Sequence, residues 1–130
     1  MRYNKTIPII ITEQLEKVKE FYTKLLNFSV TFDHPEYLAL KHKTNSDLEV
    51  GFMKPQPGQA IYNSGLFLGF DVTDVDAEYK RLIADGAIIF QPLSDKPWGD
   101  RSFAIQDPIG VTLYFCTPIE PSGEFKKYFK

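Results

Sequence analysis

The chain has 130 residues, a formal net charge of −2, and 43% hydrophobic and 25% charged residues. This length fits one compact domain, and the composition excludes a largely disordered chain. The near balance of 15 basic and 17 acidic residues excludes the excess positive charge of a typical nucleic-acid-binding domain. Aromatic residues make up 15% of the chain, a share that either fills a core or lines a cleft for a flat organic ligand.

The single cysteine, Cys116, excludes an intramolecular disulfide and favours a reducing compartment. It lies in the apolar run 113–116, where a small buried hydrophobe is expected rather than a nucleophile. No stretch reaches the ~18 apolar residues of a membrane span, and the chain starts without the long apolar region of a signal peptide. We therefore expect a cytoplasmic protein with no membrane partner.

The first half of the chain predicts a strand, a helix and three further strands. Residues 7–11 are rich in isoleucine and predict a strand, in which Pro8 indicates an edge or a bulge. Thr12 fits a helix N-cap, apolar residues then recur at helical spacing up to residue 26, and Asn27 ends the helix. Turn-forming residues separate the strands predicted at 28–32, 37–41 and 48–53.

The same order begins again after a loop over residues 54–64. A strand is predicted over 66–72, followed by a helix that Thr73 or Asp74 caps and Gly86 ends. Short strands are predicted at 87–90, 101–106 and 111–115. Asp107 opens the turn before the last strand, where its carboxylate is expected to bond backbone amides. The elements therefore repeat at a distance of about 60 residues.

This repeat predicts an α+β protein of two βαβββ modules, module one at about 5–54 and module two at about 65–116, with a C-terminal tail at 117–130. Two such units can pair their sheets into a curved, half-barrel mixed sheet, with the helices outside and a cup between the modules. A ferredoxin-like α+β sandwich is the alternative. The tail is basic and aromatic and is expected to fray, with docking as a short helix as the alternative.

Two stretches of the sequence resemble a known family. Residues 97–115, with Trp-Gly-Asp-Arg at 98–101 and Asp-Pro-Ile-Gly at 107–110, look like the closing hairpin of the glyoxalase/bleomycin resistance protein/dioxygenase superfamily, the vicinal oxygen chelate fold. Residues 21–28 are similar to the end of that family's first helix, with Asn27 replacing the usual glycine. The resemblance covers nearly the whole chain and implies a single vicinal oxygen chelate domain over 1–130.

That fold hosts metal-dependent isomerases, ring-cleaving dioxygenases, thiol transferases that destroy fosfomycin and metal-free drug-binding proteins, so function must come from the site. In the metal enzymes, four strand positions facing the cup carry His, Gln or Glu, which suit a divalent metal. The resemblance places these positions at about Thr6, near Gly51, at about Phe67 and at Tyr114. None of the four is a strong metal ligand.

The remaining candidate ligands are few. Glu49 is the only carboxylate near any of the four positions, and it shares a strand face with Gly51. His34 precedes Pro35 in a predicted turn and His42 ends a predicted strand, so both are expected on the surface. Because a catalytic metal typically needs three protein ligands, we expect no metal and no other cofactor. A metal site whose ligands lie in a different register is the alternative.

Aromatic residues at these positions predict a pocket for a small organic ligand instead. The strand at 111–115 alternates, so Tyr114 should face the cup, with its hydroxyl offered to a ligand, while Leu113 faces the helices. Phe67, Trp98 and Tyr114 are the expected ligand contacts, with Arg101 as a charged partner. The alternative for Arg101 is a salt bridge to Asp100 or Asp107, and the alternative for the aromatic residues is a filled core.

The resulting hypothesis is a glyoxalase/bleomycin-resistance-like protein that binds a small, for example aromatic, organic ligand in the cup without a metal. A glyoxalase-like metal-dependent lyase or isomerase is the alternative enzyme, and a structural or partner-binding module with a filled cup is a third possibility. The sequence identifies no catalytic residue. Uncovered strand edges, together with the way the resembling proteins pair their modules, imply a homodimer.

Overall fold

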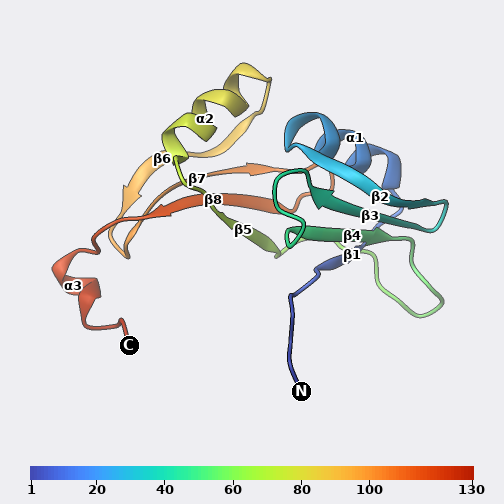
Figure 1. The fold of residues 1–130 in the computed structure, drawn as a ribbon, viewed down its shortest axis with the longest axis horizontal. Coiled ribbons are helices and arrows are strands. Elements are labelled where there is room, and N and C mark those ends of the chain that lie inside the picture. Colours follow the sequence, from blue (N-terminus) through green and yellow to red (C-terminus); the bar gives the residue numbers. More distant parts are fainter. The chain divides into compact units, whose positions relative to one another are not determined.

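A computed structural model describes residues 1–130 and shows an α+β fold of two compact units, Met1–Ser64 and Gly65–Lys130. Each unit is a βαβββ module with its own open, four-stranded mixed sheet (Figure 1). In both sheets the first strand of the module is parallel to the last, and the other pairs are antiparallel. The predicted α+β architecture of two βαβββ modules is therefore confirmed.

The first module contains β1 (Ile9–Ile11), α1 (Leu15–Leu25), β2 (Phe28–His34), β3 (Tyr37–His42) and β4 (Glu49–Met53). Its strands lie in the order β1-β4-β3-β2. Helix α1 packs on one face of this sheet through Val18 and Tyr22, which are fully buried. The Tyr22 ring contacts Phe52 of β4, with 5.3 Å between the ring centroids. The core of the module is therefore the layer between α1 and its sheet.

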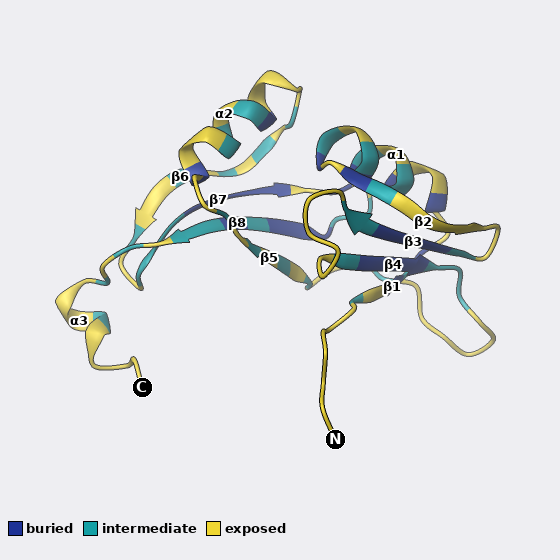
Figure 2. Cartoon of the chain, in the orientation of Figure 1, coloured by how far each residue is buried: buried dark blue, intermediate teal, exposed yellow.

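The second module contains β5 (Phe67–Asp71), α2 (Val75–Ala84), β6 (Ile89–Lys96), β7 (Asp100–Gln106) and β8 (Thr112–Pro118). Its strands lie in the order β5-β8-β7-β6. Tyr79 of α2 packs its ring on Phe103 of β7 at 4.9 Å, and Phe103 stacks on Phe115 of β8 at 5.0 Å. Among the strands of this module, only the central strands β7 and β8 carry buried residues (Figure 2). We call the face of this sheet turned away from α2 the far face.

Strand β6 departs most from the predicted boundaries. The sequence predicts a strand at 87–90, whereas β6 extends over Ile89–Lys96 and Lys96 pairs with Asp100 in a tight hairpin. The sequence does not predict the longer strand because Pro92 lies within it, and a proline in such a run argues against a strand. Proline is tolerated here because β6 is an edge strand and its ladder is irregular around Pro92.

The helix ends follow the sequence signals, with one exception. Gln14, not Thr12, is the N-cap of α1; its side chain makes no capping bond, and Thr12 Oγ1 accepts the Gln14 N–H at 3.1 Å. Asp74 caps α2 as predicted, accepting a 3.0 Å hydrogen bond from the backbone N–H three residues on. Asn27 and Gly86, past the two helix ends, have positive φ angles of 60° and 94°, as predicted.

We expect Asp74→Ala to lower the free energy of unfolding by about 0.5–2 kcal/mol, because it removes the one side-chain acceptor at the start of α2. Gln14→Ala is the matched control: it changes the N-cap of the other helix, where no side-chain capping bond exists. Urea denaturation of both variants makes the comparison. An equal effect of the two substitutions would show that the Asp74 cap does not stabilise α2.

The C-terminal tail docks as a short helix, α3 (Gly123–Lys126), in place of the expected frayed tail. The Ile119 N–H donates to the Gly99 carbonyl and the Ser122 N–H donates to the Pro97 carbonyl, both at 2.9 Å. These bonds anchor the tail on the turn between β6 and β7. None of the helices has the length and apolar character that crossing a membrane would need.

Candidate ligand-binding face of the second module

Tyr114 and Leu113 lie on opposite faces of β8, as strand alternation predicts. Leu113 is fully buried, and its neighbour two residues on, Phe115, stacks with Phe103 on the α2 side. Tyr114 is half-buried on the far face, where its ring centroid lies 6.2 Å from that of Phe67. The predicted register of this strand is therefore confirmed.

The Tyr114 hydroxyl is the centre of a hydrogen-bond network on the far face. It donates to the Asp100 carboxylate, with 2.9 Å to each oxygen, and accepts a 2.7 Å bond from Ser102 Oγ. Lys96 Nζ donates to Ser102 Oγ and to its carbonyl, both at 3.0 Å. Trp98 Nε1 donates to Asp100 Oδ2 at 3.1 Å. Strands β6, β7 and β8 and the turn that carries Trp98 all contribute to this network.

The network commits the Tyr114 hydroxyl to protein partners, so the sequence expectation that this hydroxyl is offered to a ligand does not match the structure. Burial, and secondarily the hydrogen bond to Asp100, raise the pKa of Tyr114 above its ordinary value, against an opposing effect of Ser102. The phenol is therefore neutral at neutral pH. What remains available to a ligand is the face of the ring.

This pKa shift predicts a loss of stability at high pH. Because the folded-state pKa of Tyr114 is raised, its contribution is fully present below about pH 10 and is lost as pH rises through the folded-state pKa. We expect a late tyrosinate step in an ultraviolet absorbance titration that Tyr114→Phe removes. Tyr3→Phe, which also deletes one tyrosine, should leave that step in place; its disappearance in the control would contradict the assignment.

Phe67 and Tyr114 flank an open position on this face, and the turn before β7 adds the exposed ring of Trp98. Phe67 is 56% exposed and Trp98 is 45% exposed, although both are large apolar side chains. Gly69 pairs with Tyr114 in the sheet, and no atom lies within 4 Å of the position that a Cβ would take there. Rings flanking a position without a side chain can take up a flat organic molecule.

Cys116 also lies on the far face, two residues beyond Tyr114, and is half-buried. Its Sγ lies 3.7 Å from the Phe70 carbonyl oxygen. Burial, and secondarily the charges of Asp100 and Asp71, raise the pKa of the thiol. A raised pKa disfavours the thiolate, so the thiol is not activated as a nucleophile.

Arg101 lies on the α2 side, because it sits between Asp100 and Ser102, which face the other way. Its guanidinium donates to both carboxylate oxygens of Asp76 on α2, at 2.9 and 3.1 Å, and to Asp95 of β6 at 2.9 Å. The predicted salt bridge is found, but with these partners and not with Asp100 or Asp107. The structure does not bring Arg101 together with Phe67, Trp98 and Tyr114.

Asp107 fulfils its predicted role in the turn before β8. Its Oδ1 accepts the backbone N–H groups of Ile109 at 3.0 Å and Val111 at 2.9 Å. This carboxylate is buried and holds the turn that sets the start of β8. The motif at 107–110 therefore serves the fold and positions Tyr114 indirectly.

The positions implied for a metal do not carry a fitting set of donors. Thr6 precedes β1, the hydroxyl of Tyr37 lies over Gly51, and the other two positions are Phe67 and Tyr114. Glu49 is engaged by Lys5 Nζ at 2.7 Å and, more loosely, by Lys41 Nζ at 4.0 Å. No three His, Cys, Asp or Glu side chains come together in an arrangement that could hold a metal ion.

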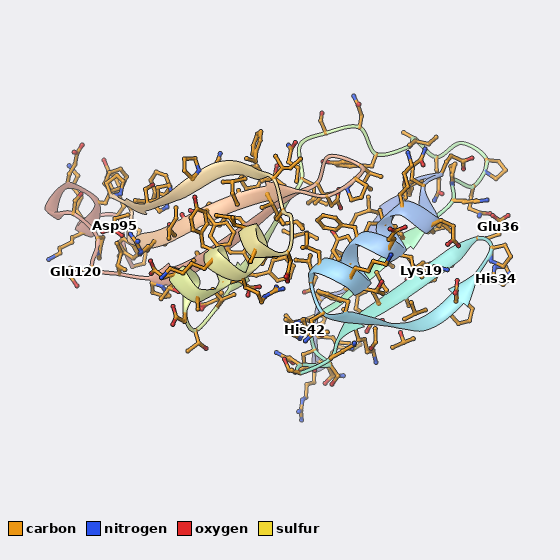
Figure 3. The ribbon with its side chains drawn as sticks, turned by 90° about the horizontal axis from the view of Figure 1, so that it is seen from above. Lys19, His34, Glu36, His42, Asp95 and Glu120 are labelled. Carbon is orange, nitrogen blue, oxygen red and sulfur yellow. The ribbon has the colours of Figure 1, made fainter.

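The two histidines are far apart in the first module, His34 at the end of β2 and His42 at the end of β3 (Figure 3). Each Nδ1 lies within hydrogen-bond distance of a backbone N–H two residues on, at 3.1 Å for His34 and 3.2 Å for His42. Both rings thus stabilise local turns.

No pattern in the sequence predicts the groove of about 680 Å³ that the first module contains. It forms where the start of α1 meets the β2–β3 hairpin, and Lys19 bridges it through ion pairs with Glu16 at 3.0 Å and Asp33 at 3.2 Å. Its walls are mainly charged and contain no phenylalanine, tyrosine or tryptophan. The groove therefore lacks the aromatic lining of the far face.

Comparison with known proteins places the chain in a family. Residues 5–115 match the family model for the Glyoxalase/Bleomycin resistance protein/Dioxygenase superfamily. Curated relatives include uncharacterized proteins of Mycobacterium bovis and Mycobacterium tuberculosis, each 46% identical over 39 residues. That match covers 30% of this chain and 26% and 23% of the two relatives, so the chain aligns with about a quarter of their length.

Solved structures share the fold at low identity. A glyoxalase/bleomycin resistance protein/dioxygenase from Nocardioides aligns with a TM-score of 0.76 and 20% identity, over 92% of this chain and 86% of the other. TnmS3, an antibiotic binding protein from Streptomyces, aligns with a TM-score of 0.71 and 24% identity, over 90% and 97% of the two chains. On the family match and the shared fold, the chain belongs to the glyoxalase/bleomycin resistance protein/dioxygenase superfamily.

Proposed function

We propose that this protein binds a small, flat organic ligand on the far face of the second sheet and does so without a metal ion. The observation that carries the proposal is the unfilled space beside Gly69, flanked by the rings of Phe67 and Tyr114. Trp98 supplies a further exposed ring, fixed by its bond to Asp100. Stacking on such rings favours a ligand with an extended π-system.

The donor chemistry supports binding over metal-dependent catalysis. The positions that the family resemblance implies for a metal, at about Thr6, near Gly51, at about Phe67 and at Tyr114, carry no strong metal ligand, and the nearby Glu49 is neutralised by Lys5. Among the proteins of similar fold, TnmS3 is described as antibiotic-binding, which is in keeping with a ligand-binding role for this fold. The proposal for this chain rests on its own aromatic face.

A substitution that fills the space tests the proposal. With 1-naphthalenemethanol as a neutral flat probe, in buffer containing EDTA, calorimetry should detect binding to the unmodified protein. Gly69→Val should abolish most of that binding without unfolding the protein, because its φ is not left-handed and the site has room for the side chain. No binding in EDTA, or undiminished binding by Gly69→Val, would contradict the proposal.

Gly123→Val is the matched control for this experiment. Gly123 begins α3, its added Cβ would also meet no atom within 4 Å, and it lies outside β5. The control should therefore bind the probe as the unmodified protein does. Thermal denaturation of both variants shows whether either one has lost its fold.

We also propose that the protein is a homodimer. The edge strands of both sheets leave large apolar side chains exposed, Phe32 on β2 and Phe90 on β6. Exposed edges of this kind are commonly covered by pairing with another chain. Sedimentation at micromolar concentration should give twice the 15.0 kDa mass of the chain. A monomer under those conditions would refute this proposal.

A further inference from the structure

We propose that the ligand of the far face is an organic cation, a flat molecule carrying a protonated amine that Asp100 and Asp71 attract. This inference rests on the proposed ligand-binding function and deepens it by naming the ligand's chemical class. It is argued from the charges and rings that share this one face of the second sheet.

Asp100 is a carboxylate without a cationic partner. Its oxygens accept hydrogen bonds from the Tyr114 hydroxyl and the Trp98 indole, both neutral donors. The ammonium group on the same face, that of Lys96, bonds Ser102, and no basic group lies within 4.0 Å of the Asp100 carboxylate. Neutral donors orient the carboxylate but leave its charge uncompensated.

Asp71 adds a second carboxylate to the same face. It lies two residues beyond Gly69, pairs in register with Cys116, is exposed, and makes no ion pair or side-chain hydrogen bond. Asp100 and Asp71 both act on the Cys116 thiol, raising its pKa, so their fields overlap at that point of the face. The charged strand residues on the far face are therefore two carboxylates, Asp100 and Asp71, and one ammonium group, that of Lys96. The other two charged strand residues, Asp95 and Arg101, lie on the α2 side.

The aromatic rings complement this negative charge. A ring face attracts a cation placed over it, most strongly for tryptophan. Phe67 and Tyr114 flank the open position at Gly69, and Trp98 and Tyr114 bond Asp100 directly. A flat aromatic amine can therefore stack on a ring while its ammonium group approaches a carboxylate. An anionic ligand would meet repulsion at the same place.

Three probes that share one ring system and differ in charge test the inference. They are 1-naphthylmethylamine, 1-naphthalenemethanol and 1-naphthoate, each titrated calorimetrically at pH 7 and low salt. We expect the amine to bind about tenfold more tightly than the alcohol, and the carboxylate to bind most weakly. Raising the salt concentration should weaken binding of the amine and leave the alcohol unchanged.

Asp100→Asn and Asp71→Asn should each reduce affinity for the amine several-fold and leave affinity for the alcohol unchanged. The asparagine oxygen at position 100 can still accept from Tyr114 and Trp98, which preserves the network. Asp95→Asn is the matched control, since it removes the same charge from the same hairpin on the α2 side, where Asp95 pairs with Arg101. Its affinity for the amine should stay within twofold of the unmodified protein.

The outcomes separate this inference from the proposed function. Equal affinity for the three probes, preference for the carboxylate, or an equal effect of Asp95→Asn and Asp100→Asn would overturn the cation assignment and leave ligand binding intact. Failure of all three probes to bind would overturn the ligand-binding function itself, and the cation assignment with it.

Discussion

Replacing Phe103 by alanine is expected to lower the free energy of unfolding by about 3–5 kcal/mol. Phe103 is fully buried, stacks on Phe115 at 5.0 Å and contacts Tyr79 of α2 at 4.9 Å. Removing its ring leaves a cavity between α2 and the centre of the sheet, and neither element can relax far enough to fill it. Chemical denaturation monitored by circular dichroism measures the change.

Phe67→Ala is the control for this stability effect. It removes the same ring from the same sheet, but from an exposed position on the far face. We expect Phe67→Ala to lower the free energy of unfolding by well under half as much as Phe103→Ala does. Similar costs for the two substitutions would mean that the far face, and not the α2 side, forms the core of the second module.

Replacing Tyr114 by alanine is expected to weaken binding of 1-naphthylmethylamine by about 1–3 kcal/mol, or roughly five-fold to 150-fold. The substitution removes the ring beside Phe67 and also the hydroxyl that orients Asp100. Calorimetric titration of the variant against the unmodified protein gives the change in affinity. Circular dichroism confirms that the variant is folded at the temperature of the titration.

Tyr114→Phe separates the two contributions of this residue. It keeps the ring and removes the bonds to Asp100 and Ser102, while Ser102 Oγ retains Lys96 as a partner. Because the hydroxyl is already engaged by the protein, we expect this variant to keep most of the affinity. A loss as large as that of Tyr114→Ala would show that the ligand contacts the hydroxyl and not the ring.

Local patterns in the sequence were enough to predict the repeated modules. The helical stripes that end at Asn27 and Gly86 both terminate in positive φ, and the Asp74 cap is where the sequence indicates it. Alternation along β8 correctly separated Tyr114 from Leu113, because a one-residue slip would have exposed the apolar set. Each of these features depends only on residues that are close together in the sequence, so the sequence alone is enough to predict it.

The polar network could not be predicted because it depends on the pairing of three strands. Lys96 meets Ser102 only through the β6–β7 hairpin, and Pro92 hid the strand that forms it. The alternation of β7, which turns Arg101 toward Asp76 of α2 and Asp100 toward Tyr114, was available in the sequence. The choice of partners was not, because Asp76 is 25 residues away along the chain.

The position implied for a first-strand metal ligand shows a different limit. The resemblance placed it at about Thr6, but β1 begins only at Ile9. Ile9 pairs with Gly51 in the first sheet, as Gly69 pairs with Tyr114 in the second. Short strands give little pattern from which to fix a register. The structure was needed to show that the Tyr37 hydroxyl, carried by β3, lies over Gly51.

The central claim is that the far face of the second sheet binds a flat organic ligand without metal. Amide chemical-shift mapping of the full chain with 1-naphthylmethylamine, in buffer containing EDTA, tests it most directly. We predict that the perturbed resonances concentrate on β5, β7 and β8 and include the indole N–H of Trp98, the only tryptophan. Perturbations confined to the groove at the start of α1, or perturbations that appear only after a divalent metal is added, would contradict the claim.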